Sequence, residues 1–285
     1  MDKQISFSWD IHLKCNYRCP YCWHFDKWDQ YQNVYPGVDK LVETWKRIYN
    51  LYGECKISIY GGEPSIYPGI DNFLLKLIEY HRVSITTNLS SGFKYFIDRL
   101  SEDLVDKVQF SASFHPLFSD ENDFLKKVIY IKNKVDNIYV AYVAYPEQIE
   151  NLLKYKKFFN DNNIKFQILK FYGYYNGKKY PEAYNDSEKK KIGIYEFVPC
   201  EKGEKTVVVE KKEFVPKGKL CNAGHKYATI ASNGDVRFCG GFDWENISMN
   251  IGNIFDPNFK LLDKPIICPA EICPCHEWVK ALVDK

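Results

Sequence analysis

Three cysteines lie within eight residues near the start of the chain. Cys15, Cys19 and Cys22 are separated by three and then by two residues, and they follow a short alternating apolar run. Thiolates at this spacing can each bind one iron of a cubic iron–sulfur cluster and leave the fourth iron without a protein ligand. Half of a zinc site is an alternative, although zinc would need a fourth Cys or His and such sites are normally closed. Three unrelated buried thiols are the other alternative.

A second group of cysteines lies toward the carboxyl end. Cys221 and Cys239 flank Asn233-Gly234, the strongest short signal for a β-hairpin, so antiparallel pairing can bring their thiols together. The tail supplies three more: Cys268, Cys273 and Cys275. Five thiols in a part of the chain too small for a good core predict a metal that holds this part together. Zinc and a second iron–sulfur cluster are both compatible with the spacing.

Composition narrows the class of protein. The chain has 285 residues and a formal net charge of +2, without long blocks of like charge, so neither nucleic acid nor an anionic membrane is expected as a partner. Its apolar runs are too short to span a bilayer, and the polar N-terminus predicts no signal peptide. We expect a cytoplasmic protein, in which ten cysteines indicate metal ligands or catalytic groups rather than disulfides.

The elements that must position these thiols alternate between strands and helices. We expect strands at 5–13, 56–60, 83–87, 107–113, 138–145 and 164–171, and helices at 38–51, 70–81, 93–100, 123–134 and 146–162. This alternation predicts an α/β fold with a parallel sheet and right-handed crossovers. An open doubly wound sheet and a partial barrel both fit, and both gather their chemistry at the carboxyl ends of the strands. The first cysteine group follows the first strand, at such an end.

With these motifs in hand, the chain resembles the radical S-adenosylmethionine (SAM) enzymes, and within them the branch with a C-terminal SPASM or twitch domain. The matching motifs are Cys15-x3-Cys19-x2-Cys22 with Tyr21 before the last cysteine, Gly61-Gly62-Glu63-Pro64 after the second expected strand, and Cys221-x12-Gly234-x4-Cys239 with the late cysteines. The resemblance implies a partial (β/α)6 TIM-like barrel over residues 1–200. A small twitch domain, a β-hairpin plus a helix near 278–282, would follow over residues 201–285.

The resemblance also implies the cofactors. Cys15, Cys19 and Cys22 would hold a [4Fe-4S] cluster whose open iron binds SAM, and an electron would cleave SAM to a 5′-deoxyadenosyl radical that abstracts hydrogen from a substrate. Gly61 and Gly62 allow close backbone approach, so that carbonyl groups, aided by Glu63, can receive the SAM ammonium group. The remaining expected cofactor contacts are Pro64, which fixes the exit of this turn, and the polar residues Asn88, Ser111 and Ser113 at two strand ends.

Five late cysteines fit the single-cluster twitch form. A [4Fe-4S] cluster needs at most four protein ligands, so Cys268, Cys273 and Cys275 compete for the places beside Cys221 and Cys239. The auxiliary cluster favours net oxidation of a small sugar- or alcohol-like molecule, with an electron donor such as flavodoxin or ferredoxin. Cross-linking or epimerisation of a ribosomally made peptide is the alternative, although no peptide-binding module is apparent at the N-terminus. A non-catalytic, metal-stapled binding module is the remote alternative.

Two polar residues of the first strand are candidate catalytic residues. Asp10 and His12 alternate with apolar neighbours, so they are expected on one face near the active end of the strand. Buried polar groups need partners, and a substrate is one option. A satisfied structural pair is the other. Cys200 lies outside both cysteine groups, and it is either incidental or a hydrogen-atom donor in a stereochemical inversion.

Overall fold

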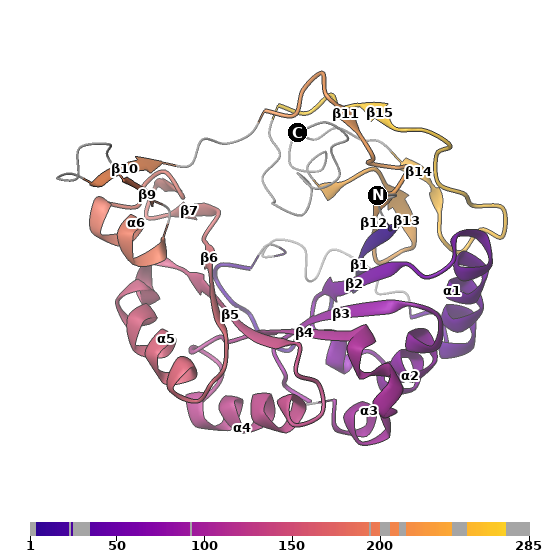
Figure 1. Ribbon diagram of the computed structural model, residues 1–285, viewed down its shortest axis with the longest axis horizontal. Helices are drawn as coiled ribbons and strands as arrows, with labels where there is room; N and C mark the ends of the chain where they lie inside the picture. Colours follow the sequence, from indigo (N-terminus) through magenta and orange to yellow (C-terminus); the bar gives the residue numbers. More distant parts are fainter. Residues whose placement is uncertain are drawn as a thin grey trace.

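A nine-stranded sheet dominates the computed structural model. The structure describes residues 4–22, 24, 35–91, 93–193, 195–199, 206–210, 215–240 and 250–271, with the strands at 195–199 and 206–210 described by their backbone alone. The strand order of the large sheet is β14-β13-β12-β1-β2-β3-β4-β5-β6. Figure 1 shows this sheet as an open arc with the helices around its outside.

Six parallel strands form the main part of the sheet. They are β1 (Ser6–His12), β2 (Lys56–Gly61), β3 (Arg82–Thr87), β4 (Val108–Ser113), β5 (Ile138–Ala144) and β6 (Phe166–Lys170). The helices between them are α1 (Val38–Tyr52), α2 (Ile70–Tyr80), α3 (Lys94–Arg99), α4 (Glu121–Lys132) and α5 (Leu152–Asp161), with 3-10 turns η1 (Pro64–Ile66), η2 (Glu102–Lys107) and η3 (Pro146–Asn151). The predicted α/β fold is confirmed, and each of these strands lies within two residues of its expected bounds.

The hydrophobic core lies between the sheet and its helices. Phe7 and Trp9 of β1 both pack on Trp45 of α1, with ring centroids 5.5 Å apart in each case. Successive side chains of a strand point to opposite faces. Ser8 and Asp10 therefore point away from the helices, toward the concave face of the arc.

The predicted hairpin at Asn233-Gly234 is confirmed, but its location was not predicted. It joins β12 (Tyr227–Ile230) to β13 (Asp235–Arg237), which in turn pairs with β14 (Asn250–Asn253). Strand β12 pairs in parallel with β1, so the hairpin continues the sheet of the half-barrel. The hydroxyl group of Tyr227 donates to that of Ser8 over 3.0 Å across this junction.

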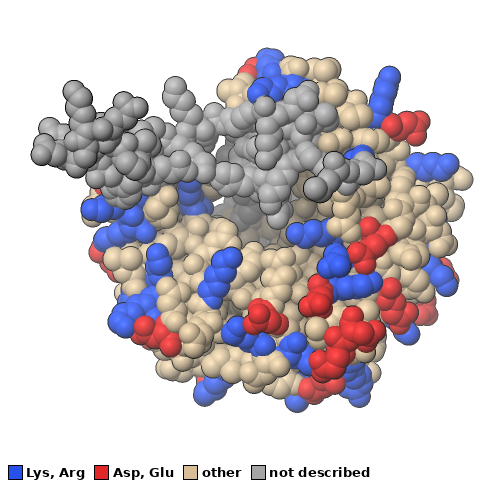
Figure 2. Space-filling view, in the orientation of Figure 1, with Lys and Arg blue, Asp and Glu red and all other residues tan. Residues whose placement is uncertain are grey.

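The smaller elements follow β6 in the sequence. They are β7 (Gly173–Tyr175) with β8 (Lys178–Tyr180), α6 (Asp186–Ile192), β9 (Tyr195–Pro199) with β10 (Thr206–Glu210), and β11 (Leu220–Cys221) with β15 (Ile266–Ile267). The helix expected near 278–282 lies outside the described residues. No helix in the described part of the chain is both long and apolar enough to cross a bilayer. On the face seen in Figure 2, Lys and Arg side chains lie among Asp and Glu side chains.

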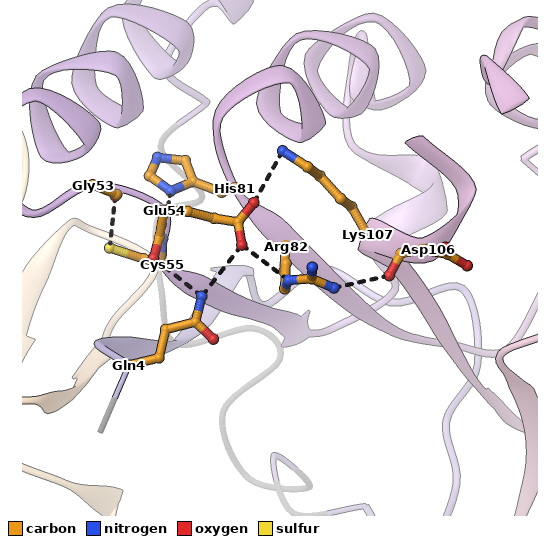
Figure 3. A network of polar contacts seen from close by, with 8 residues as sticks. All are labelled: Gln4, Gly53, Glu54, Cys55, His81, Arg82, Asp106 and Lys107. Carbon is orange, nitrogen blue, oxygen red and sulfur yellow. Dashed lines mark hydrogen bonds and ion pairs between the residues drawn. The ribbon is translucent and has the colours of Figure 1, made fainter. Parts of the chain in front are cut away.

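An ion-pair network joins the amino ends of three neighbouring strands, and we call it the amino clamp (Glu54, Arg82 and Lys107). The Glu54 carboxylate lies 2.9 Å from Nε of Arg82 and 3.0 Å from Nζ of Lys107. Arg82 also donates to the carbonyl oxygen of Asp106, and Gln4 donates to the carbonyl oxygen of Glu54, as Figure 3 shows. The clamp therefore ties together the starts of β2, β3 and β4, at the edge opposite the cysteines.

Candidate functional site

The cysteine loop, residues 13–22, follows β1 and reaches the carboxyl ends of β4 and β5. The hydroxyl group of Tyr21 lies 3.1 Å from Nδ1 of His115, which follows β4. Burial lowers the pKa of His115 to about 4, so the imidazole is neutral at neutral pH, and its tautomer sets which of the two groups donates. Tyr17 stacks on Phe118 with ring centroids 5.0 Å apart, and Tyr21 lies against Tyr145 after β5. Aromatic contacts thus hold the loop at the edge where parallel sheets gather their chemistry.

The three thiols of this loop lie close together, and two of them receive backbone hydrogen bonds. Backbone N–H groups two residues downstream donate to the sulfur atoms of Cys15 and Cys22, each over 3.4 Å. Such bonds stabilise cluster-bound thiolates and tune their potential. Burial, followed by the nearby Cys22 and Cys15, raises the pKa of Cys19 to about 12. The pKa of Cys15 is also raised, mainly by burial, so the free thiols of Cys15 and Cys19 are protonated at neutral pH and a bound metal would have to displace these protons.

The three thiols of this loop are near enough to affect one another's pKa. Within the described ranges, no three Cys, His, Asp or Glu side chains form a group that could hold one metal ion. A cubic cluster takes each thiolate on a different iron, so its ligands stand apart. The cluster on Cys15, Cys19 and Cys22 stays a prediction.

The glycine turn, residues 61–64, supports the start of the cysteine loop. The N–H of Gly62 donates to the carbonyl oxygen of His12 over 2.7 Å, and that of Glu63 donates to the carbonyl oxygen of Lys14 over 3.0 Å. A Cβ on Gly61 would lie 2.2 Å from the His12 oxygen, and one on Gly62 would lie 2.0 Å from the Lys14 oxygen. The two glycines are therefore required by the backbone that enters the cysteine loop, a role that the sequence did not reveal.

Glu63 binds the neighbouring strand end with its carboxylate. The side chain is 1% exposed and accepts hydrogen bonds from N–H of Ser65 (2.9 Å), N–H of Asn88 (2.7 Å) and the hydroxyl group of Thr87. Burial raises the pKa of Glu63, and these hydrogen bonds partly oppose the shift. The carboxylate thus fixes the glycine turn against the end of β3. The carbonyl oxygen of Gly62, in contrast, accepts no hydrogen bond from the described residues.

The candidate catalytic residues of β1 do not pair with each other. His12 is fully buried, and its Nε2 lies 2.9 Å from the carbonyl oxygen of Glu63, so its ring holds the glycine turn. Burial lowers the pKa of His12, which favours the neutral ring. Asp10 lies 3.8 Å from Nε2 of His24, and an irregular register separates it from His12. A catalytic role for either residue stays a prediction.

The expected SAM contacts at the ends of β3 and β4 differ in their partners. The amide of Asn88 donates to Asn16 over 3.1 Å, and its oxygen accepts from N–H of Ser90. Asn88 therefore holds the cysteine loop, and Asn16 is a supporting residue that sequence reasoning missed. Ser111 and Ser113 lie on the concave side of β4, without a side-chain hydrogen bond to any residue that the structure describes.

Three cysteines of the second group come together. Cys221, Cys239 and Cys268 are buried in one small cluster with Phe238 and Tyr227. Pairing of β11 with β15 brings two of these segments together, and the N–H of Ala223 donates to the sulfur of Cys221 over 3.4 Å, the same local geometry as at Cys15. Cys273, Cys275 and Cys200 lie outside the described residues.

Comparisons with known proteins match parts of the chain. Residues 10–128 match the family model described as the radical SAM superfamily. The chain is 27% identical over 180 residues to a GTP 3′,8-cyclase of Helicobacter pylori, which covers 56% of this chain and 54% of that protein. It is 33% identical over 108 residues to an S-adenosylmethionine-dependent nucleotide dehydratase of a Thermoplasmatales archaeon, and this alignment covers 36% of this chain and 37% of that protein. The chain thus spans about half the length of the first relative, and less of the second.

Among solved structures, SuiB of Streptococcus suis bound to S-adenosylmethionine shares the fold. Its TM-score is 0.57 at 17% identity, over 90% of this chain and 64% of SuiB. The first strand of this parallel half-barrel leads into the loop that carries Cys15, Cys19 and Cys22. The family model, which matches less than half of the chain, supports a relationship to the radical SAM superfamily, and the solved structure shows a shared fold.

Proposed function

We propose that this protein is a radical SAM enzyme that binds a [4Fe-4S] cluster on Cys15, Cys19 and Cys22, with SAM at the open iron. Reductive cleavage of SAM would supply a 5′-deoxyadenosyl radical for hydrogen abstraction from a substrate. The observation that carries this proposal is the cysteine loop, which the glycine turn holds at the carboxyl edge of the sheet. A flavodoxin- or ferredoxin-like protein is the proposed electron donor.

The residues that would hold SAM can be divided by what they already contact. The carbonyl oxygen of Gly62 accepts no bond within the described chain and is the proposed acceptor for the ammonium group. Ser111 and Ser113 are proposed to contact the rest of the molecule from β4. Glu63 and Asn88 would act indirectly, because their polar atoms already bind the neighbouring loops.

We further propose an auxiliary [4Fe-4S] cluster in residues 201–285. The buried Cys221, Cys239 and Cys268 support it, with a fourth ligand from Cys273 or Cys275. Such a cluster could accept the electron left on a substrate radical and would favour net oxidation. The two curated relatives carry the names of enzymes that act on nucleotides, which favours a small molecule over a peptide as substrate.

Iron analysis and SAM cleavage test the proposal together. Anaerobically reconstituted protein should hold about eight irons per chain in two four-iron clusters, and once reduced it should release 5′-deoxyadenosine from SAM. Cys15→Ala should lose both the first cluster and the cleavage. Cys55→Ala, which removes another buried thiol at the start of β2, is the matched control and should retain both. Zinc in place of iron, or reduced protein that leaves SAM intact, would contradict the proposal.

A further inference from the structure

The concave face of the sheet is lined by hydroxyl and amide side chains. On β4, Phe110 packs against Phe93 beside α3, with ring centroids 5.5 Å apart, so Gln109 and Ser111 point away from the helices. On β2, Ile57 and Ile59 are fully buried beneath the helices, whereas Ser58 between them is partly exposed on the other face. A closed eight-stranded barrel fills this side with bulky apolar residues. This half-barrel does not.

The strand register places several of these side chains side by side. Ser8 lies opposite Thr229 on one side and Ser58 on the other, Ser58 lies opposite Ser84, and Ser84 lies opposite Gln109. We call these five residues, Thr229, Ser8, Ser58, Ser84 and Gln109, the hydroxyl row. The row crosses five adjacent strands at one level, about 4.8 Å from strand to strand. It begins on β12, so the C-terminal segment contributes to it.

Most members of the hydroxyl row have no polar partner among the residues that the structure describes. Ser8 accepts from Tyr227, but the side chains of Ser58, Ser84 and Gln109 form no hydrogen bond with the described residues. The hydroxyl oxygen of Thr229 is buried and also lacks a partner within the described chain. Buried and half-buried polar atoms are normally satisfied by protein, water or a ligand. A row of such atoms on the concave side of an enzyme sheet is suited to bind a ligand.

The charges near the row argue against a phosphorylated ligand. Arg237, opposite Thr229, already interacts with another group of the chain. Toward the amino edge, Arg82 and Lys107 are paired with Glu54 in the amino clamp, which leaves Lys56 at the exposed start of β2. Toward the carboxyl edge, the charged group on β1 is the carboxylate of Asp10. Phosphate groups are bound by clustered Arg, Lys or backbone N–H groups, and the described residues form no such cluster at the row.

A peptide is also a poor match for the hydroxyl row. An extended peptide usually adds to a free sheet edge, where backbone groups are unpaired. All five strands of the row are interior, with a neighbour on each side. Hydroxyl groups both donate and accept, so a row of them matches a molecule whose own surface is made of hydroxyl groups.

We propose that the hydroxyl row binds a hydroxyl-rich small molecule without phosphate groups, and that Ser58, Ser84 and Gln109 determine its specificity. This inference rests on the proposed function and names the substrate class of the same site. It separates this protein from its curated relatives, which carry the names of enzymes that act on nucleotides.

A treated small-molecule extract tests the substrate class. Reduced, reconstituted protein is given SAM and a cell extract from which proteins have been removed by size. One portion of the extract is untreated, one is digested with alkaline phosphatase, and one is oxidised with periodate, which cleaves vicinal diols. The increase in 5′-deoxyadenosine above the level without extract should survive phosphatase and disappear after periodate. Loss after phosphatase indicates a phosphorylated substrate, and survival of periodate indicates a substrate without vicinal diols; either result, or no increase at all, overturns the inference. SAM cleavage without extract tests the proposed function separately.

Variants test the residues. Ser84→Ala and Gln109→Leu should each raise KM for the active extract component about fivefold to tenfold, because each variant loses one neutral hydrogen bond. Each should weaken the equilibrium binding of that component to unreduced protein by the same factor. Ser84→Thr keeps the hydroxyl group and should restore binding. Ser187→Ala, on the exposed surface of α6, is the control. SAM cleavage without substrate should stay unchanged in all four variants. If Ser84→Ala and Gln109→Leu bind the component as the wild type does, the assignment of these residues is wrong.

Discussion

Two glutamates tie strand ends together at opposite edges of the sheet. Glu54, in the amino clamp, is 32% exposed and lies between two cations. Burial alone would raise the pKa of Glu54, but the hydrogen bonds from Lys107 and Arg82 lower it overall. Glu63, at the carboxyl edge, is almost fully buried among neutral donors, and its pKa is raised. The two glutamates of this sheet therefore have pKa values shifted in opposite directions.

The difference between the two glutamates shows how strongly each edge of the sheet is fixed. An exposed ion pair contributes little free energy, because water and salt screen it and its side chains lose conformational entropy when they are held in one geometry. A buried carboxylate with several neutral donors is costly to disturb, because each donor left without a partner is desolvated. The amino edge therefore tolerates change, whereas the carboxyl edge holds one geometry for the cysteine loop.

The largest effect is expected at the glycine turn. Gly62→Ala would place a Cβ 2.0 Å from the Lys14 oxygen, so the backbone before Cys15 must move. We expect a loss of stability on the order of 3 kcal/mol and the loss of most cluster binding. Iron content and thermal unfolding measure the two effects. Gly37→Ala, where nothing lies within 4 Å of the new Cβ, is the matched control. A Gly62→Ala protein that loads iron as well as this control would refute the supporting role of the turn.

The second effect is expected at Glu63. In Glu63→Gln the amide nitrogen must face one of the donors that now bind the carboxylate, which should reduce the free energy of unfolding by about 2 kcal/mol. Because the folded pKa of Glu63 is raised, its contribution to stability is fully present below its ordinary pKa of 4.5 and is lost as pH rises through the folded value. Denaturant titrations of both proteins at several pH values should show this dependence in the wild type and its absence in the variant. Identical pH profiles would contradict it.

A smaller effect is expected at the amino clamp. Glu54→Gln should reduce stability by less than about 1 kcal/mol, because the ion pairs are partly exposed. The difference from wild type should shrink at high salt, and iron content should not change. Denaturant titrations at low and high salt, with iron analysis, measure both. A fall in iron content in this variant would mean that the two edges are coupled.

The smallest effect is the acid sensitivity of Glu54. Its lowered pKa means that its contribution is present above the ordinary value of 4.5 and is lost as pH falls through the folded value. Wild type and Glu54→Gln should therefore become equally stable in acid, the opposite trend from that at Glu63. Unfolding curves of the pair at neutral and acid pH test this, and a difference that persists in acid would be evidence against it.

Local patterns in the sequence were sufficient for the elements of the fold. Alternating apolar runs predicted the six parallel strands, and Asn233-Gly234 predicted its hairpin, because strand periodicity and turn chemistry depend on neighbouring residues. The spacing of Cys15, Cys19 and Cys22 likewise predicted a cluster site, since three thiols so close in the chain remain close in space. The carboxyl end of β1 was the expected location, and the structure has it there.

Only the tertiary structure decided which distant residues meet. The pairing of β12 with β1, the bonds from Glu63 to Thr87 and Asn88, and the need for Gly62 beneath Lys14 all join segments far apart in the chain. Ser58 and Ser84 are unremarkable as single residues, and the strand register alone makes them neighbours. Register depends on the packing of whole strands, and a shift of one residue would turn both side chains to the other face. The sequence by itself determined the spacing of the cysteines and the chemistry expected of them, and the folded sheet decided what lies around them.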